Sequence, residues 1–142
     1  MTQKKGLREQ FKTNTKFESE GVDFVISDTE KIRIRRHGGT NSVKIAQAQA
    51  KFSKPYIGRI KSQEMTQSDI TKIVAKVFVE CSVIGWEGIT EENGTPMEFN
   101  FDNAVKLMCE LPDLLNTLMV YAENMENFKD APEVDNSELG NS

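Results

Sequence analysis

The stretch LPDLLNTLMVYAENM, residues 111–125, carries the clearest folding pattern in the chain. Its apolar residues fall at relative positions 0, 3, 4, 7, 8, 11 and 14, so they lie along one face of an α-helix. Pro112 suits the first turn of such a helix, where a backbone N–H has no partner within the helix. The pattern therefore predicts a helix over residues 112–128 that buries one face against the rest of the protein.

Capping signals and apolar spacing predict further helices upstream. Asn100 is suited to cap a short helix with apolar residues on one side. Thr66 and Asp69 are spaced as in a capping box and precede apolar residues at helical spacing. An alanine-rich segment predicts a helix that ends before Pro55, because proline disfavours the helical conformation in the residue before it. The predicted helices cover residues 42–53, 67–84 and 101–110.

Residues 22–36 predict a β-hairpin. Apolar and polar residues alternate on both sides of a turn at Asp28-Thr29-Glu30. In the second strand Ile32 and Ile34 would face inward, so cationic side chains gather on the opposite face. This basic patch is a candidate interaction surface and consists of Lys31, Arg33, Arg35 and Arg36.

Together these elements indicate one α+β domain that is predominantly α-helical. The chain has 142 residues, close to the usual size of a single domain. We expect the N-terminal hairpin to pack on a small bundle of about four helices within residues 15–128. Residues 1–14 are polar and basic, which predicts a flexible arm. Residues 129–142 are acidic with almost no apolar side chains, which predicts a disordered tail.

The two halves of the chain carry opposite charge. Residues 1–62 contain 14 Lys and Arg against 6 Asp and Glu, whereas residues 63–142 contain 4 against 16. Such a division suits nucleic-acid binding by the basic part, or head-to-tail association in which the acidic part of one copy meets the basic part of another. Pairing of the charges within one fold explains the same counts. The sequence leaves these alternatives open.

The sequence lacks the residue combinations that most catalytic and metal-binding sites require. His37 is the single histidine, and Cys81 and Cys109 lie 28 positions apart without a CxxC pair. Phosphate-binding glycine loops, HExxH and GxSxG are absent from the sequence. We therefore expect no catalytic residues, no metal and no cofactor, and a protein that is not an enzyme.

The sequence also indicates where in the cell the protein is expected. No stretch approaches the roughly 18 apolar residues of a membrane helix, and residues 1–20 are polar and charged rather than signal-like. Without a secretory signal, the two cysteines are read as buried free thiols. We expect no membrane contact and a cytoplasmic location.

The segment WEGITEENGTPMEF, residues 86–99, carries a resemblance to a known family. It combines a Trp-x-Gly-hydrophobic stretch with an acidic glycine turn, and it precedes a final helix that starts at Pro112-Asp113. In these features, and in the basic hairpin followed by a helix ending at Lys54-Pro55-Tyr56, residues 20–128 resemble the tail assembly chaperones of long-tailed bacteriophages.

The residues of this segment also have a structural explanation of their own. Asn93 and Gly94 supply the positive backbone dihedrals of a tight turn, and Gly88 permits close approach of another segment. Trp86 would anchor the loop by burying its ring. We therefore expect these four residues to act structurally rather than in binding.

The resemblance implies a non-catalytic chaperone in the host cytoplasm. Such proteins bind the tape measure protein, keep it soluble, and help recruit tail tube subunits, in part through a longer, frameshifted product. On this reading Arg33, Arg35 and Arg36 meet acidic surface on the client or on another copy, so self-association is expected. The residues expected to make apolar contact with the client are Leu114, Leu118, Met119, Tyr121 and Met125.

Two other functions remain as alternatives. A structural tail or neck protein would use the same fold for permanent contacts and would be found in the virion. A small nucleic-acid-binding module would use the basic hairpin, but that strand lacks interleaved aromatic residues and the chain is net acidic at −4. We do not expect nucleic acid as a partner.

Overall fold

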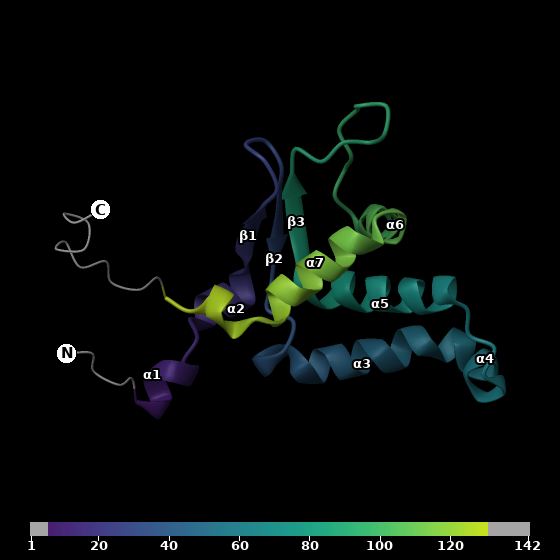
Figure 1. Cartoon of the computed structure of the whole chain (residues 1–142), viewed down its shortest axis with the longest axis horizontal. Helices are drawn as coiled ribbons and strands as arrows, with labels where there is room; N and C mark the ends of the chain where they lie inside the picture. Colours follow the sequence, from purple (N-terminus) through teal and green to yellow (C-terminus); the bar gives the residue numbers. More distant parts are fainter. Residues whose placement is uncertain (1–5, 131–142) are drawn as a thin grey trace.

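A three-stranded antiparallel sheet packs against a layer of helices (Figure 1). The computed structural model describes residues 6–130 of the chain. The strands, in spatial order, are β1 Val22–Val25, β2 Lys31–Ile34 and β3 Val83–Glu87. The helices are α1 Leu7–Phe11, α2 Thr15–Glu20, α3 Ser42–Ser53, α4 Ile57–Ser62, α5 Gln67–Ser82, α6 Phe101–Glu110 and α7 Pro112–Glu123. Short 3₁₀ turns cover Gly39–Asn41, Lys54–Tyr56 and Met125–Phe128. The predicted α+β, mostly helical class is confirmed.

The hairpin forms as its alternation predicts. β1 and β2 pair antiparallel with Phe24 opposite Ile32. Ile32 and Ile34 are completely buried, whereas the residues between and beside them are only partly covered. The Ser27 hydroxyl accepts a hydrogen bond from the Glu30 amide at 3.2 Å and so stabilises the turn.

Helix α5 lies at the centre of the molecule, between α3 on one side and α6 and α7 on the other (Figure 1). Its N-terminus is a capping box. The Thr66 hydroxyl accepts from the Asp69 amide at 3.1 Å, and the Asp69 carboxylate accepts from the Thr66 amide at 3.2 Å. The Asp69 carboxylate also accepts from the Arg59 guanidinium at 2.7 Å, which joins α4 to the start of α5.

The prediction that this helix extends to residue 84, with a loop from residue 85, is wrong. The helix ends at Ser82, and β3 follows without a linker. Val83 pairs with Ile34 and Trp86 pairs with Ile32, so β3 becomes the third strand of the sheet. The β-branched residues at the end of the apolar stripe suit a strand as well as a helix. Because they pair with β2, they form a strand.

Helix α6 has its predicted bounds, while α7 ends earlier than predicted. The Asn100 side chain accepts from the Asn103 amide at 2.8 Å and caps α6. The predicted helix 112–128 stops at Glu123, because Asn124 adopts an extended conformation and its side chain accepts from the Glu126 amide at 3.0 Å. A 3₁₀ turn then returns the chain to the body, where Phe128 is completely buried.

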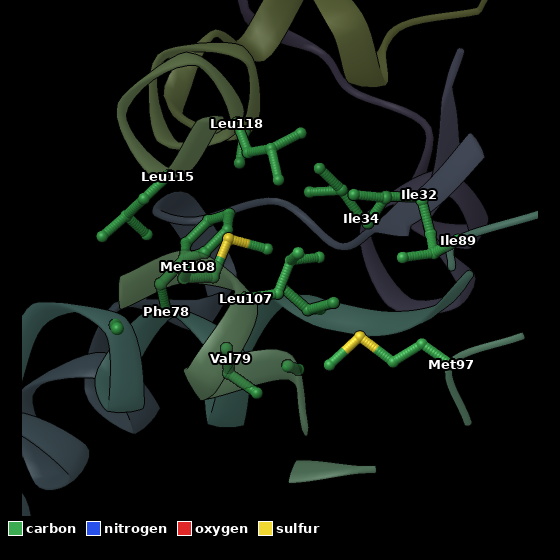
Figure 2. Close-up of a cluster of buried hydrophobic side chains, with 14 residues drawn as sticks. Ile32, Ile34, Phe78, Val79, Ile89, Met97, Leu107, Met108, Leu115 and Leu118 are labelled. Atoms are coloured by element: carbon green, nitrogen blue, oxygen red, sulfur yellow. The ribbon is translucent and has the colours of Figure 1, made fainter. Parts of the chain in front are cut away.

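The main core lies where β2, α5, α6 and α7 meet (Figure 2). Figure 2 shows Phe78 of α5 beside Met108 of α6, with Leu118 of α7 and the β2 isoleucines nearby. A second, smaller cluster joins Ala48 of α3 to Val77 and Cys81 of α5. Because α5 contributes to both clusters, the two helical layers depend on it.

The N-terminal part of the described chain contains short helices that the sequence did not indicate. Asn14 caps α2, and its amide donates to the Phe128 carbonyl at 2.8 Å, which brings the two ends of the described chain together. Residues 1–5 of the predicted arm and residues 131–142 of the predicted tail lie outside the described residues. Within residues 6–130, no helix has both the length and the apolar character needed to cross a bilayer.

His37 connects three elements at the end of β2. Its Nδ1 lies 2.6 Å from the Ser82 hydroxyl, and its ring packs edge-on to Phe78 with centroids 5.2 Å apart. Its amide donates to the Ala122 carbonyl at 2.9 Å. Burial lowers the pKa of His37, so the folded protein favours the neutral imidazole.

We predict that replacing Gly88 destabilises the fold through its backbone. Gly88 has φ +75°, and an added Cβ would lie 1.9 Å from the Thr29 carbonyl oxygen. Gly88→Ala should lower the free energy of unfolding by at least about 2 kcal/mol in urea titrations. The matched control is Gly58→Ala, where no atom lies within 4 Å and the backbone is helical, and it should raise stability by about 0.5 kcal/mol. Equal effects of the two substitutions would contradict this account.

We predict that the fold loses stability below about pH 6.5, the ordinary pKa of histidine. Because folding lowers the pKa of His37, the unfolded chain takes up its proton first as the pH falls. The loss should reach at most about 1.4 kcal/mol per pH unit, the limit for one proton. Thermal unfolding from pH 7.5 to pH 5.5 measures it, and His37→Asn should flatten the profile because the chain has no second histidine. An equally steep profile in the variant would refute the assignment.

Candidate interaction groove

An apolar groove of about 200 Å³ opens between the first half of α5 and residues 112–119 of α7. Its walls are formed by apolar residues, and its rim is formed by neutral polar residues. The groove is lined by Gln67, Ile70, Thr71, Val74, Pro112, Leu115, Asn116 and Met119.

Helical spacing positions each wall of the groove. Ile70 and Val74 lie one turn apart on α5, and Leu115 and Met119 lie one turn apart on α7. Leu115 is buried and closes the floor, whereas the Ile70 side chain remains 43% exposed. An isoleucine so exposed beside a flexible methionine offers apolar surface that the fold itself does not cover.

The chemistry of the groove limits what it can bind. None of its lining residues is ionisable, so none of these side chains can act as a general acid or base. Its volume is below the roughly 300–1,000 Å³ typical of small-molecule sites. An apolar side chain presented by a partner fits it better than a free metabolite does.

The residues predicted to contact a client lie in different parts of the structure. Met119 lines the groove. Leu118 is completely buried in the main core, and Leu114 packs partly against that core. Tyr121 faces the sheet, with its ring edge-on to Phe24 at 5.0 Å. Met125 lies in the 3₁₀ turn after α7.

Ile70 and Val74 belong to the apolar residues at helical spacing after Asp69, and this spacing predicts that both are buried. The elements packed against this helix do not cover the full width of its apolar stripe. The stripe is therefore partly exposed at the N-terminal end of the helix. The width of the stripe was visible in the sequence. Which end of the stripe lacks a packing partner depends on where α7 crosses α5, and the sequence does not predict that crossing.

The cations of the basic patch are mostly paired within the fold. Arg33 donates to the Asp23 carboxylate at 3.1 Å and to the Glu20 carbonyl at 2.8 Å. Lys31 lies 3.5 Å from Asp23 and 3.6 Å from Glu87. Internal pairing thus accounts for much of the charge on this strand. Arg35 has no ion pair among residues 6–130, and its Nε is buried without a hydrogen-bond partner.

Arg36 and Glu18 form the most buried ion pair in the described part of the chain, at 2.7 Å. Burial by itself raises the pKa of Glu18, but hydrogen bonds from Thr13, Thr40 and Arg36 outweigh it and lower the pKa. Ionised Glu18 therefore stabilises the fold above about pH 4.3, the ordinary glutamate pKa, and this stabilisation is lost as the pH falls further. The pair fixes α2 to the end of the hairpin.

The loop between β3 and α6 is held by Trp86, which lies in β3 rather than in the loop where the sequence predicted it. Trp86 Nε1 donates to the Met97 carbonyl at 2.9 Å, and its ring packs edge-on to Phe99 with centroids 5.0 Å apart. At the turn, the Asn93 side chain accepts from the Thr95 amide at 3.0 Å, and Gly94 has φ +87°. The prediction that Asn93 also has a positive φ is wrong, since Gln63 is the one non-glycine residue within 6–130 with a positive φ.

The cysteines show no sign of reactivity. Cys81 is buried and Cys109 partly buried, and burial raises the pKa of both thiols, which keeps them protonated. Among residues 6–130, no group of three or more His, Cys, Asp or Glu side chains is placed to hold a metal ion.

Larger hollows exist elsewhere, but they lack the form of a site. The one beside α1, about 660 Å³, is lined only by Leu7, Arg8, Phe11 and Lys12, so one short helix supplies its only wall. The one on the open face of the sheet, about 330 Å³, is bordered by Lys31, Arg33, Asp23 and Glu87, whose charges largely satisfy one another.

The fold and the groove define a small, mostly helical α+β protein with an open apolar surface between two helices. Residues 40–138 match the family model described as YdaY prophage protein, and the chain belongs to that family. It is therefore a phage-derived protein. No curated protein and no solved structure shows a significant match to it.

We predict that Arg36 and Arg33 differ sharply in their effect on stability. Arg36→Gln leaves the buried Glu18 carboxylate without its cation and should lower the free energy of unfolding by about 3 kcal/mol. Arg33→Gln breaks a more exposed pair with Asp23 and should cost less than about 1 kcal/mol. Urea unfolding at neutral pH compares them. A similar loss in both variants would show that the Arg36 pair has no special structural role.

Proposed function

We propose that this phage-derived protein is a non-catalytic tail assembly chaperone that binds the tape measure protein. In this role it keeps that long client soluble in the host cytoplasm and helps recruit tail tube subunits during tail morphogenesis. The groove between α5 and α7 is the observation that carries the proposal. The resemblance of residues 20–128 to tail assembly chaperones and the membership in a prophage family support it.

The groove has the features of a surface that accepts a helix. A client helix with apolar side chains three or four residues apart would place one of them over Leu115, between Ile70 and Met119. Methionine adapts to apolar side chains of different shape, which suits a client with many similar but unequal segments. The neutral rim of Gln67, Thr71 and Asn116 imposes no charge requirement on the client.

The absence of ionisable groups from the groove is consistent with a role without catalysis or a cofactor. Tail tube subunits would be recruited through a longer product of the same gene, as the resemblance implies. Nucleic acid is a weaker candidate partner, because Lys31, Arg33 and Arg36 are engaged by acidic side chains of the same chain.

We predict that Ile70→Asp combined with Met119→Asp weakens client binding. Two carboxylates in an apolar groove would be desolvated by a bound helix, so affinity should fall by at least about tenfold, or 1.4 kcal/mol. The assay is the soluble fraction of a co-expressed tape measure protein and its co-purification with a tagged copy. The matched control is Val25→Asp combined with Ile26→Asp, which places the same charges on exposed residues of the hairpin.

Circular dichroism establishes that both double variants remain folded. Unchanged client solubility with the folded groove variant would refute the groove as the binding site. Recovery of the protein from purified, mature particles would instead favour a structural tail or neck protein.

A further inference from the structure

The lysines of α3 and α4 are not balanced by acidic residues nearby in the chain. From Lys31 to Gln63 the sequence has no aspartate or glutamate. Two of the cations in this region are neutralised by α5, since Lys51 pairs with Glu80 and Arg59 with Asp69, at 2.8 and 2.7 Å. Three exposed lysines, Lys44, Lys54 and Lys61, form no ion pair within residues 6–130.

Helix α7 presents the opposite charge. Asp113 and Glu123 are exposed on its outer side, and neither forms an ion pair in the part of the chain that the structure describes. Val120 lies between them at helical spacing and is 61% exposed. We define Asp113, Val120 and Glu123 as the acidic face.

The matching surface lies on α4. Ile57 and Ile60 are 56% and 45% exposed, and α4 has no buried residue. Lys54 and Lys61 stand on either side of these isoleucines in the chain. We define Lys54, Ile57, Ile60 and Lys61 as the basic face.

The two faces belong to different layers of the molecule. α4 lies with α3 beyond one side of α5, while α7 lies with α6 on the other side (Figure 1). A single molecule therefore cannot bring its own basic face against its own acidic face. Two different copies can, and each would then retain one unused face.

We propose that the basic face of one copy binds the acidic face of the next, so that the protein associates head to tail. Each face combines exposed apolar side chains with charge of one sign, and the signs are complementary. A contact between two different surfaces need not close, so copies add to a growing filament. This inference stands apart from the client groove, whose residues it does not use.

A second copy fits the basic face better than nucleic acid does. Phosphates would pair with Lys54 and Lys61 but would leave Ile57 and Ile60 uncovered, and there is no aromatic platform of exposed rings on α4 for stacking bases. Val120 offers the apolar surface that the isoleucines require.

Sedimentation velocity of the purified full chain, treated with nuclease, tests the proposal. The wild-type protein should form a concentration-dependent series of oligomers at low salt and dissociate at about 1 M salt, where charges are screened within about 3 Å. Lys54→Glu with Lys61→Glu should be monomeric, as should Asp113→Lys with Glu123→Lys. Mixing these two variants in equal amounts should restore the oligomers, because each reversed face again meets its opposite.

The matched control is Lys44→Glu with Lys72→Glu, which changes net charge equally on exposed residues outside both faces, unpaired within residues 6–130, and should associate like the wild type. Circular dichroism checks folding, and if a reversed variant unfolds, Lys54→Gln with Lys61→Gln replaces it with an expected loss of at least about tenfold in association. A wild-type monomer at all concentrations in low salt would overturn the proposal. So would failure of the mixture to reassociate, loss of association in the control, or oligomers that disappear with nuclease. A monomeric variant that still solubilises the tape measure protein separates this proposal from the client groove.

Discussion

Burial of Ile32 and Ile34 in the main core, which β2 shares with α5, α6 and α7, is the constraint on which the rest of the structure depends. These residues lie on β2, the central strand, which pairs with β1 beside it in the chain and with β3 much further along. α5 leads directly into β3, and the chain then returns through α6 and α7, which also contribute to the core that covers the isoleucines. The two buried isoleucines of this one strand therefore supply the hairpin's share of the main core.

The groove is a consequence of this arrangement. α7 must place Leu118 over the main core and also reach the sheet, where Tyr121 meets Phe24. A straight helix that meets both requirements crosses α5 at an angle, so its first turns diverge from those of α5. The apolar residues at the diverging ends, Ile70 and Met119, are left partly open. An uncovered apolar surface arises here from the geometry of helix packing.

Local signals in the sequence were sufficient for much of the fold. The cap at Asn100, the capping box at Thr66 and Pro112 each placed the start of a helix, because a helix start depends on only a few neighbouring residues. The third strand and the early end of α7 were missed. Val83 becomes a strand through pairing with the distant Ile34, and no local pattern reports such a partner. For the candidate site, spacing identified Met119, but it could not separate buried Leu118 from exposed surface without the position of the facing helix.

The bond from Trp86 to the Met97 carbonyl has a practical consequence. The chain contains one tryptophan, so indole fluorescence of this protein comes from a single, known position in β3, whose side chain bonds to the loop between β3 and α6. The ring is partly buried against Phe99, and its emission will shift when that loop comes loose. None of the groove residues is in this loop. A shift in the tryptophan emission therefore reports opening of the loop and not a change in the groove between the helices. The protein thus carries its own optical reporter.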